Sequence, residues 1–265
     1  MSTLVMKFGG ASVEKPELFS SCAEIILERS KKYRNIAVVV SAMKGMTDEL
    51  IALAKKVNYS PQPREYDMLI SVGERISISL LAMALAKKEC EAVSFTGSQT
   101  GIITCHSHTN AKIIDVNPYR LFPHLELGKV VIVAGFQGVS RKGDVTTLGR
   151  GGSDTTAVAL GVALKAEKVE FYKDVPGIFE KDPKNYPGSS LLTSLTYQQA
   201  LQLARKGAQV LHERSIFLAS QNQMPLIVLS FKDFLKQKEL QGTFIGKKGR
   251  ARPNPSYENA YKSRL

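Results

Sequence analysis

Short β-branched runs alternate with segments of helical pattern along most of the chain. Several of these runs are apolar on both faces, which is typical of strands in a parallel sheet that is covered by helices on both sides. The pattern therefore predicts an α/β fold, a three-layer αβα sandwich around a largely parallel sheet. The strand-like runs are residues 4–8, 36–41, 92–96, 130–135, 168–173 and 226–230.

Two of the predicted helices have readable ends. Pro16 begins a helix that runs to about Lys32, since proline is favoured in the first turn. Thr196 and Gln199 form a T-x-x-Q capping box, and Gly207 is a stop signal for that second helix.

Two boundaries divide the chain. A weaker one near residue 167 separates the Gly-rich loops from a second series of strands and helices. The other follows Gly246, where the apolar pattern stops. Residues 247–265 hold six Lys or Arg against one Glu, a composition that predicts a basic, solvated and flexible tail.

Composition narrows the class of protein. The chain has 265 residues, 43% hydrophobic and 23% charged, which excludes collagen-like and wholly disordered proteins and suits one large domain or two small ones. Three cysteines without a C-x-x-C pair argue against a zinc module or a disulfide scaffold. We expect a cytoplasmic protein without a membrane segment, because no signal peptide is recognisable and the longest apolar run, residues 76–86, is short. The net charge of +12 suggests an anionic partner: nucleic acid, an acidic surface or a phosphorylated ligand.

Three glycine-bearing loops lie next to predicted strands. In residues 7–12, paired glycines and Lys7 suit phosphate oxygens, although a plain tight turn explains them too. Residues 148–156 combine three glycines, an Arg and an Asp ahead of a helix, which favours an anion site over a simple helix cap. Residues 173–179 close a strand with a Pro-Gly turn. From the residues alone, this segment is either a ligand loop or a plain turn.

Several catalytic motifs are missing from the sequence. There is no P-loop, no G-x-G-x-x-G after the first strand, and no protein-kinase signature. His106 and His108 have no carboxylate near them before Asp115, so we expect no metal-ligating side chains there.

Taken together, the motifs resemble the amino-acid kinase family, and within it the catalytic domain of the aspartokinases. The resemblance covers nearly the whole chain apart from the tail, and the motifs follow in the expected order. They are KFGGASV at 7–13, VVSAMKGMTDEL at 39–50, VGER at 72–75, GRGGSDTTA at 149–157, KDVPGIFEKDP at 173–183, GAQVLHE at 207–213 and GTFIG at 242–246.

This resemblance implies an amino-acid kinase (carbamate kinase-like) fold over residues 1–246, with a substrate-binding lobe to about 166 and a nucleotide-binding lobe over about 167–246. It implies an ATP-dependent aspartate kinase that forms 4-phospho-L-aspartate with Mg²⁺, the first step of lysine (diaminopimelate), threonine and methionine biosynthesis. A homodimer is expected, and nucleic acid is not. The chemistry agrees, because the β-carboxylate of L-aspartate is ionised at neutral pH and needs no general base.

The resemblance also implies roles for individual residues. The phosphates would be held by Lys7, Phe8, Gly9 and Gly10, with Asp154 orienting the lysine and the metal-bound phosphates. Arg150 would bind the α-carboxylate of aspartate, Glu74 its α-ammonium, and Thr47, Gly151, Gly152 and Ser153 would complete the substrate site. The nucleotide side would include Ser41, Lys173, Asp174, Phe179, Lys184 and Gln209. From the residues alone, Glu74 could instead pair with a surface charge, and Phe179 could be plain core.

The sequence differs from the family pattern at some positions, and alternative functions stay open. Ala11 stands where the family commonly has Thr, and Gln209 where it has Lys. No paired regulatory ACT domains follow, so we expect activity that is insensitive to lysine and threonine. The rivals are a kinase of the same family acting on acetylglutamate, glutamate or a nucleoside monophosphate, or a basic nucleic-acid-binding protein. Glu74 discriminates among the kinases, since only a free amino group needs a carboxylate.

Overall fold

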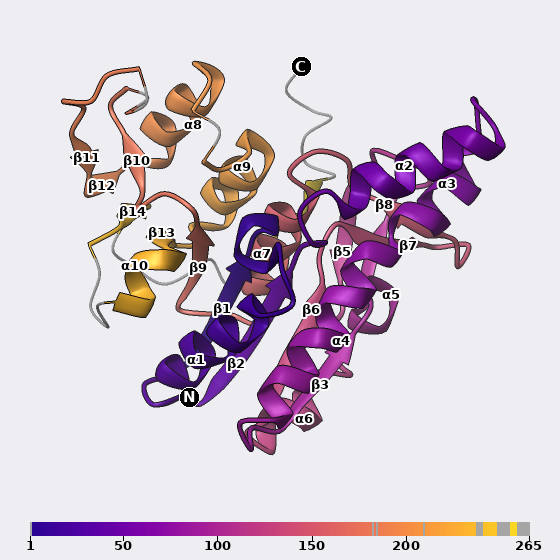
Figure 1. Cartoon of the computed structure of the whole chain (residues 1–265), viewed down its shortest axis with the longest axis horizontal. Helices are drawn as coiled ribbons and strands as arrows, with labels where there is room; N and C mark the ends of the chain where they lie inside the picture. The colour runs from indigo at the N-terminus through magenta and orange to yellow at the C-terminus, as the bar shows by residue number, and fades with distance from the viewer. Residues whose placement is uncertain are drawn as a thin grey trace.

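The computed structural model describes residues 2–181, 183, 185–208, 210–236, 241–247 and 255–258. Within these residues an eight-stranded sheet forms the centre of the fold (Figure 1). Neighbouring strands are parallel except β13 and β14. The predicted α/β fold with a largely parallel sheet is confirmed, and all six predicted strands belong to this sheet. Its order is β12 (Ser194–Leu195), β14 (Thr243–Ile245), β13 (Leu226–Ser230), β9 (Lys168–Lys173), β1 (Thr3–Phe8), β2 (Asn35–Val40), β6 (Val130–Ala134) and β3 (Ala92–Phe95).

Helices cover both faces of the sheet. On one face α1 (Leu18–Ser30) packs against β2 and α4 (Val72–Ala86) against β3 and β6, in a core that includes Leu4 and Met6 of β1. On the other face α7 (Gly152–Ala163) packs against Val5 and is itself covered by α9 (Glu213–Asn222), which contacts α8 (Tyr197–Arg205). Because successive residues of a strand point to opposite faces, the doubly apolar runs supply two hydrophobic cores.

The remaining elements form a second, smaller sheet and the edges of the fold. A second sheet, in the order β5 (Ile113–Val116), β4 (Ile102–Thr104), β7 (Gln137–Ser140) and β8 (Val145–Thr147), is absent from the sequence prediction. Its strands are only three or four residues long, so each one carries too short a pattern to be recognised in the sequence. The other elements are η1 (Gly10–Val13), α2 (Met46–Val57), α3 (Pro63–Ile70), α5 (Gly97–Thr100), α6 (Phe122–Glu126), β10 (Ile178–Phe179), β11 (Leu191–Leu192) and α10 (Phe231–Lys236).

The predicted helix ends agree closely with the structure. The first helix runs from Leu18 to Ser30 instead of from 16 to 32, and the capping box of α8 is formed. Gln199 N–H donates to Thr196 Oγ1 at 3.2 Å, and Thr196 N–H donates to Gln199 Oε1 at 2.8 Å.

The helices α3 and α4 together pass a length and hydropathy test for a membrane span, over Pro63–Ala86. The structure divides this stretch at Ser71 and buries Asp67 and Glu74 within it. Buried carboxylates with protein partners and the packing of α4 on the sheet mark these helices as part of the folded core.

The end of the chain differs from the sequence expectation. Of the predicted solvated tail the structure describes residue 247 and residues 255–258, and Glu258 is only 7% exposed. It is buried because its carboxylate pairs with Arg214 and accepts a bond from Ile113 N–H. The main sheet also runs across residue 167, since β9 pairs with β1, and the division into two lobes stays a prediction.

Candidate active site

A cavity of about 630 Å³ opens at the carboxyl ends of β1 and β2. The ends of neighbouring parallel strands converge there: Ser41 N–H donates to the Phe8 carbonyl at 3.2 Å, and Gly135 N–H donates to the Val40 carbonyl at 3.0 Å. Ligands of open α/β sheets bind at this edge, where the loops that follow the strands meet. The walls come from Lys7, Ser41, Ala42, Thr47, Asp48, Ile51, Tyr66, Ile70, Glu74, Thr109, Phe136 and residues 149–154.

Three charged side chains meet at one end of the cavity. Lys7 Nζ lies 2.6 Å from Asp154 Oδ1, and Lys173 Nζ lies 3.0 Å from Asp154 Oδ2. Lys7 and Asp154 are 4% and 6% exposed. Two ammonium groups thus share one carboxylate, which leaves one positive charge uncompensated within the group. An anion that enters here meets a positive site shielded from water.

The fold explains why these charges tolerate burial. Lys7 lies at the end of β1, Lys173 ends β9, and Asp154 lies in the first turn of α7, where a helix favours negative charge. Burial lowers the pKa of Lys7 to about 8, although Asp154 acts in the opposite direction. Burial by itself raises the pKa of Asp154, but the two ammonium groups outweigh it and hold that pKa at about 2. Asp154 is therefore an anion at neutral pH.

Glu74 lies at another wall of the cavity and is 3% exposed. Its Oε1 accepts a bond from Ala42 N–H at 3.0 Å, whereas its Oε2 has no partner among the described residues. Burial raises the pKa of Glu74 to about 7. A buried carboxylate oxygen without a partner is costly in the empty protein, and a cationic ligand group would satisfy it.

The loop between β8 and α7 forms the rim of the cavity. Gly149 and Gly151 have φ angles of +72° and +69°, which favour glycine. A Cβ on Gly151 would lie 2.3 Å from the Cβ of His212, so the loop packs tightly against the residue that precedes α9. Arg150 between them is exposed, and no ion pair or hydrogen bond of its side chain is found within the described residues. Its guanidinium is available to a ligand.

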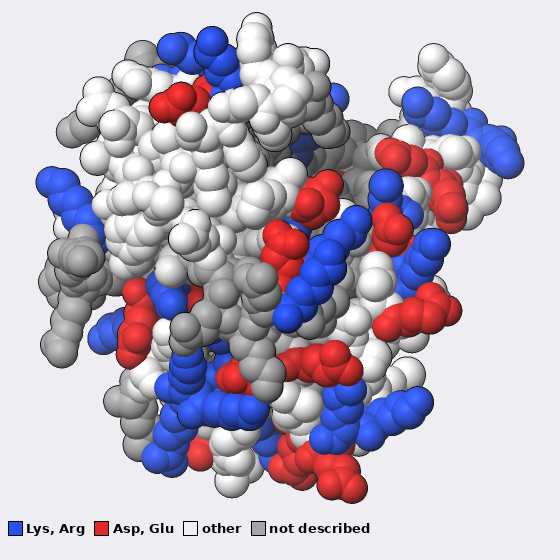
Figure 2. Space-filling model, turned by 60° about the vertical axis from the view of Figure 1, so that its left-hand side comes forward, with Lys and Arg blue, Asp and Glu red and all other residues white. Residues whose placement is uncertain are grey.

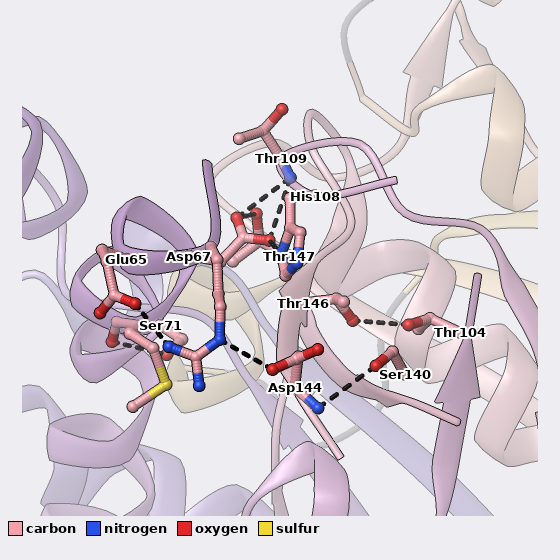
Figure 3. A network of polar contacts seen from close by, with 12 residues as sticks. Glu65, Asp67, Ser71, Thr104, His108, Thr109, Ser140, Asp144, Thr146 and Thr147 are labelled. Atoms are coloured by element: carbon pink, nitrogen blue, oxygen red, sulfur yellow. Dashed lines mark hydrogen bonds and ion pairs between the residues drawn. The ribbon is translucent and has the colours of Figure 1, made fainter. Parts of the chain in front are cut away.

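A buried carboxylate fixes the opposite wall (Figure 3). Asp67 on α3 is fully buried and accepts bonds from His108 Nδ1 at 2.8 Å and from Thr109 N–H at 3.0 Å. It also accepts from Thr147 Oγ1 at 2.6 Å and Thr147 N–H at 3.1 Å. Asp67 thereby joins α3, the loop of Thr109 and the end of β8 around the cavity.

The structure brings together many of the residues predicted from the sequence. Lining the cavity are Lys7, Ser41, Thr47, Glu74, Arg150, Gly151, Gly152, Ser153 and Asp154. Glu74 is therefore not a surface charge. Lys173 reaches the cavity through Asp154. Lys184 and Gln209 lie outside the described residues.

The other predicted nucleotide residues do not line this cavity. Phe8 is fully buried and stacks on Tyr172 with ring centroids 4.9 Å apart, so it can offer a nucleotide only its backbone. Gly9 and Gly10 follow it. Gly10 packs against the loop after β2, since a Cβ added to Gly10 would lie 3.3 Å from the Ala42 carbonyl oxygen. Asp174 is exposed just after β9, and Phe179 is half-buried in β10.

Some lining residues were missed by the sequence analysis. Tyr66, Thr109 and Phe136 belong to no motif quoted above, and the structure places each in the cavity wall. Phe136 had a usable signal, because it directly follows the predicted strand over residues 130–135, and residues that follow parallel strands line this kind of edge. Tyr66 and Thr109 had none, since their position depends on the buried Asp67 network.

Comparison with known proteins agrees with this arrangement. The profile of the amino acid kinase family matches residues 2–230. The chain belongs to the amino acid kinase family. Aspartokinase 2 of Bacillus subtilis (strain 168), a relative of this family member, is 49% identical over 230 residues, which are 87% of this chain and 56% of that protein.

Two solved structures share the fold with substantial identity. The aspartate kinase from Synechocystis superposes with a TM-score of 0.81 at 42% identity, over 96% of this chain and 41% of that one. E. coli aspartokinase III in complex with aspartate and ADP gives a TM-score of 0.82 at 27% identity, over 94% of this chain and 65% of that one. The family member described here spans about half the length of the curated relatives that it matches.

Proposed function

We propose that this chain is an aspartate kinase, which transfers the γ-phosphoryl group of ATP to the β-carboxylate of L-aspartate and forms 4-phospho-L-aspartate. The observation that carries the proposal is Glu74: a buried carboxylate oxygen without a partner lies in the same cavity as Arg150 and the Lys7–Asp154 pair. The relatives named as aspartokinases and the E. coli structure with bound aspartate and ADP support it.

The cavity offers one group for each charge of L-aspartate. Glu74 Oε2 suits the α-ammonium, because that oxygen has no partner in the part of the chain that the structure describes, and an ion pair offsets the cost of its burial. Arg150 suits the α-carboxylate, since its planar guanidinium donates two parallel bonds. Thr47 and Ser153 lie in the same wall and supply hydroxyl groups. The β-carboxylate then points toward Lys7.

Phosphoryl transfer needs alignment and charge neutralisation more than proton transfer, because the acceptor carboxylate is already ionised. Lys7 and Lys173 supply positive charge at the point where the phosphoryl group moves, and Asp154 holds both ammonium groups in place. Since this group is formed before any ligand arrives, little reorganisation is required during the reaction.

The nucleotide side of the proposal rests on the loops after β1 and β9. The backbone of Gly9 and Gly10 and the side chains of Lys173, Asp174 and Phe179 would contact ATP. No cluster of three or more possible metal-ligating side chains occurs within the described residues. Mg²⁺ would therefore be held mainly by the ATP phosphates, as is usual for this ion, and would neutralise their charge. We also propose a cytoplasmic location, a homodimer, and a place in lysine, threonine and methionine biosynthesis.

Two of the rival acceptors fit the cavity less well. Acetylglutamate and nucleoside monophosphates carry no free α-ammonium, so they would leave Glu74 Oε2 buried without a partner. For the nucleic-acid alternative, the face in Figure 2 shows Lys and Arg interspersed with Asp and Glu rather than gathered in one basic surface. None of these three rivals explains Glu74, whereas L-glutamate carries a free α-ammonium as L-aspartate does, and the acceptor profile separates those two.

The test is an acceptor profile of the purified chain. L-aspartate, L-glutamate, N-acetylglutamate and UMP are each supplied with ATP and Mg²⁺, and acyl phosphate is trapped with hydroxylamine while ADP release is followed. We expect turnover with L-aspartate alone. Arg150→Ala and Glu74→Ala should raise KM for aspartate at least about tenfold, in line with the loss of a charged contact. The exposed Arg141→Ala is the matched control. Preference for an acceptor without a free amino group would refute the proposal.

A further inference from the structure

The last described residues of the chain, Pro255–Glu258, lie against the folded domain instead of extending into solvent. Asn222 at the end of α9 holds them: its Oδ1 accepts from Ser256 N–H at 2.8 Å, and its Nδ2 donates to the Ser256 carbonyl at 2.7 Å. Tyr257 packs against the hydrophobic core on the α7 side of the sheet. This contact fixes the position of the next residue, Glu258.

Glu258 uses both of its carboxylate oxygens inside the protein. Oε2 accepts from Arg214 Nη2 at 2.7 Å and from Ile113 N–H at 2.6 Å, while Oε1 accepts from Arg214 Nε. The two side chains are 7% and 9% exposed. A buried guanidinium needs such a counter-charge, because removal of one partner leaves the other charge buried and uncompensated.

Arg214 has donors left after this pairing, and they reach the rim of the active-site cavity. Its Nη1 donates to the Leu148 carbonyl, and its Nη2 also donates to the Ala111 carbonyl. Leu148 directly precedes the loop 149–153 that carries Arg150, and Ala111 follows the wall residue Thr109 by two positions. The guanidinium of Arg214 therefore joins two segments that border the cavity.

A second contact from the same turn acts on the same loop. His212, which caps α9 two residues before Arg214, packs against Gly151, where no Cβ can be accommodated. The start of α9 thus touches the rim loop on both sides of Arg150. The orientation of the guanidinium that would bind the substrate depends on this turn.

We propose that Glu258 is a positioning residue for the substrate loop: by pairing with Arg214 it holds the carbonyls of Leu148 and Ala111, and so sets the place of Arg150. The proposal rests on the proposed function for the identity of the ligand at Arg150. The holding of the loop by the Arg214–Glu258 pair does not depend on it.

The first experiment needs no substrate. Hydrogen–deuterium exchange is compared between the 265-residue chain, Glu258→Gln and the control Glu213→Gln. The control removes an exposed carboxylate of α9 that pairs with Arg205 at the end of α8. In Glu258→Gln the amides of residues 147–153 should exchange about tenfold faster, while those of β2 stay unchanged. The control should match the parent. Equal exchange in parent and Glu258→Gln overturns the proposal, and so does uniform acceleration that includes β2, which would indicate only a general structural role.

The second experiment measures kinetics. Glu258→Gln should raise KM for L-aspartate about tenfold and leave KM for ATP within about twofold, because misplacement of Arg150 affects only the acceptor. A rise of both constants together overturns the positioning role. If Glu258→Gln does not fold, Arg214→Lys serves instead, since it keeps the charge beside Glu258 but lacks the fork that reaches two carbonyls. If the parent chain does not phosphorylate aspartate, the proposed function fails, and exchange alone decides on the loop.

Discussion

The activity of this chain should depend on pH in a way that two buried side chains determine. In the empty enzyme Glu74 must be ionised to accept the substrate ammonium, and Lys7 must be protonated to attract the phosphoryl group. The pKa of Glu74 is raised to about 7 by burial, and that of Lys7 is lowered to about 8 by burial. The competent form therefore exists mainly between these two values.

The magnitude follows from the two ionisations. With these two pKa values, a fraction of about 0.6 of the free enzyme has Glu74 ionised and Lys7 protonated at pH 7.5. At pH 6 or pH 9 this fraction is about 0.1. The ratio kcat/KM for aspartate, which reports the ionisations of the free enzyme, should thus fall about sixfold from pH 7.5 to either limit. Below pH 6 the acid limb should approach a tenfold loss per pH unit.

The assay is a series of aspartate titrations from pH 5.5 to 9 at constant ionic strength and at ATP well below its KM, so that the empty enzyme is the reference state. Glu74→Gln removes the group that titrates on the acid side, so its low residual activity should be flat below pH 7. Lys7→Arg keeps its charge throughout this range and should lose the basic limb. An acid limb that lies near pH 4.5, the usual range of a glutamate, would refute the reasoning, as would an unchanged limb in Glu74→Gln.

Two further predictions concern stability. Glu74→Gln should stabilise the fold by about 3 kcal/mol above pH 7 and by under about 1 kcal/mol at pH 5. The reason is that the raised pKa of Glu74 makes the parent less stable as pH rises from 4.5 to 7; urea unfolding at pH 5 and pH 8 checks this, and a loss of stability at pH 8 would contradict it. Asp67→Asn should lower stability by about 2–3 kcal/mol and raise KM for aspartate, because an amide cannot accept all the bonds that Asp67 receives from His108, Thr109 and Thr147. Thermal unfolding beside the exposed control Asp115→Asn measures the effect, and equal values of Tm would count against the role given to Asp67.

The sequence was informative where a residue's environment is set by its neighbours in the chain. The doubly apolar run of β13 predicted a buried strand with the observed ends, and the T-x-x-Q pattern predicted the capping box of α8. The glycines around Arg150 indicated a ligand loop, because three glycines and an Arg ahead of a helix exceed what a helix cap requires. Gly149 and Gly151 indeed have positive φ angles.

It was uninformative where burial depends on a distant partner. Glu258 is the single acidic residue of a basic stretch, so its composition suggested solvent, yet its partner Arg214 lies 44 positions earlier. Likewise Thr104 and Thr146 look like polar loop residues, but their hydroxyl groups share a buried hydrogen bond of 2.6 Å between strands of the second sheet. Such pairs are fixed by tertiary packing, which local periodicity does not encode.

The separation of charges in the cavity has a consequence for how such an enzyme can diversify. The groups proposed for phosphoryl transfer lie on the ends of β1 and β9 and on the first turn of α7, which belong to the central sandwich. The charged groups proposed to recognise the acceptor, Glu74 and Arg150, lie on α4 and on the loop before α7. Substitution of the acceptor-binding residues leaves the residues proposed for phosphoryl transfer intact. Laboratory selection for a new acceptor should therefore begin at Glu74 and residues 149–151, with Lys7, Asp154 and Lys173 held constant.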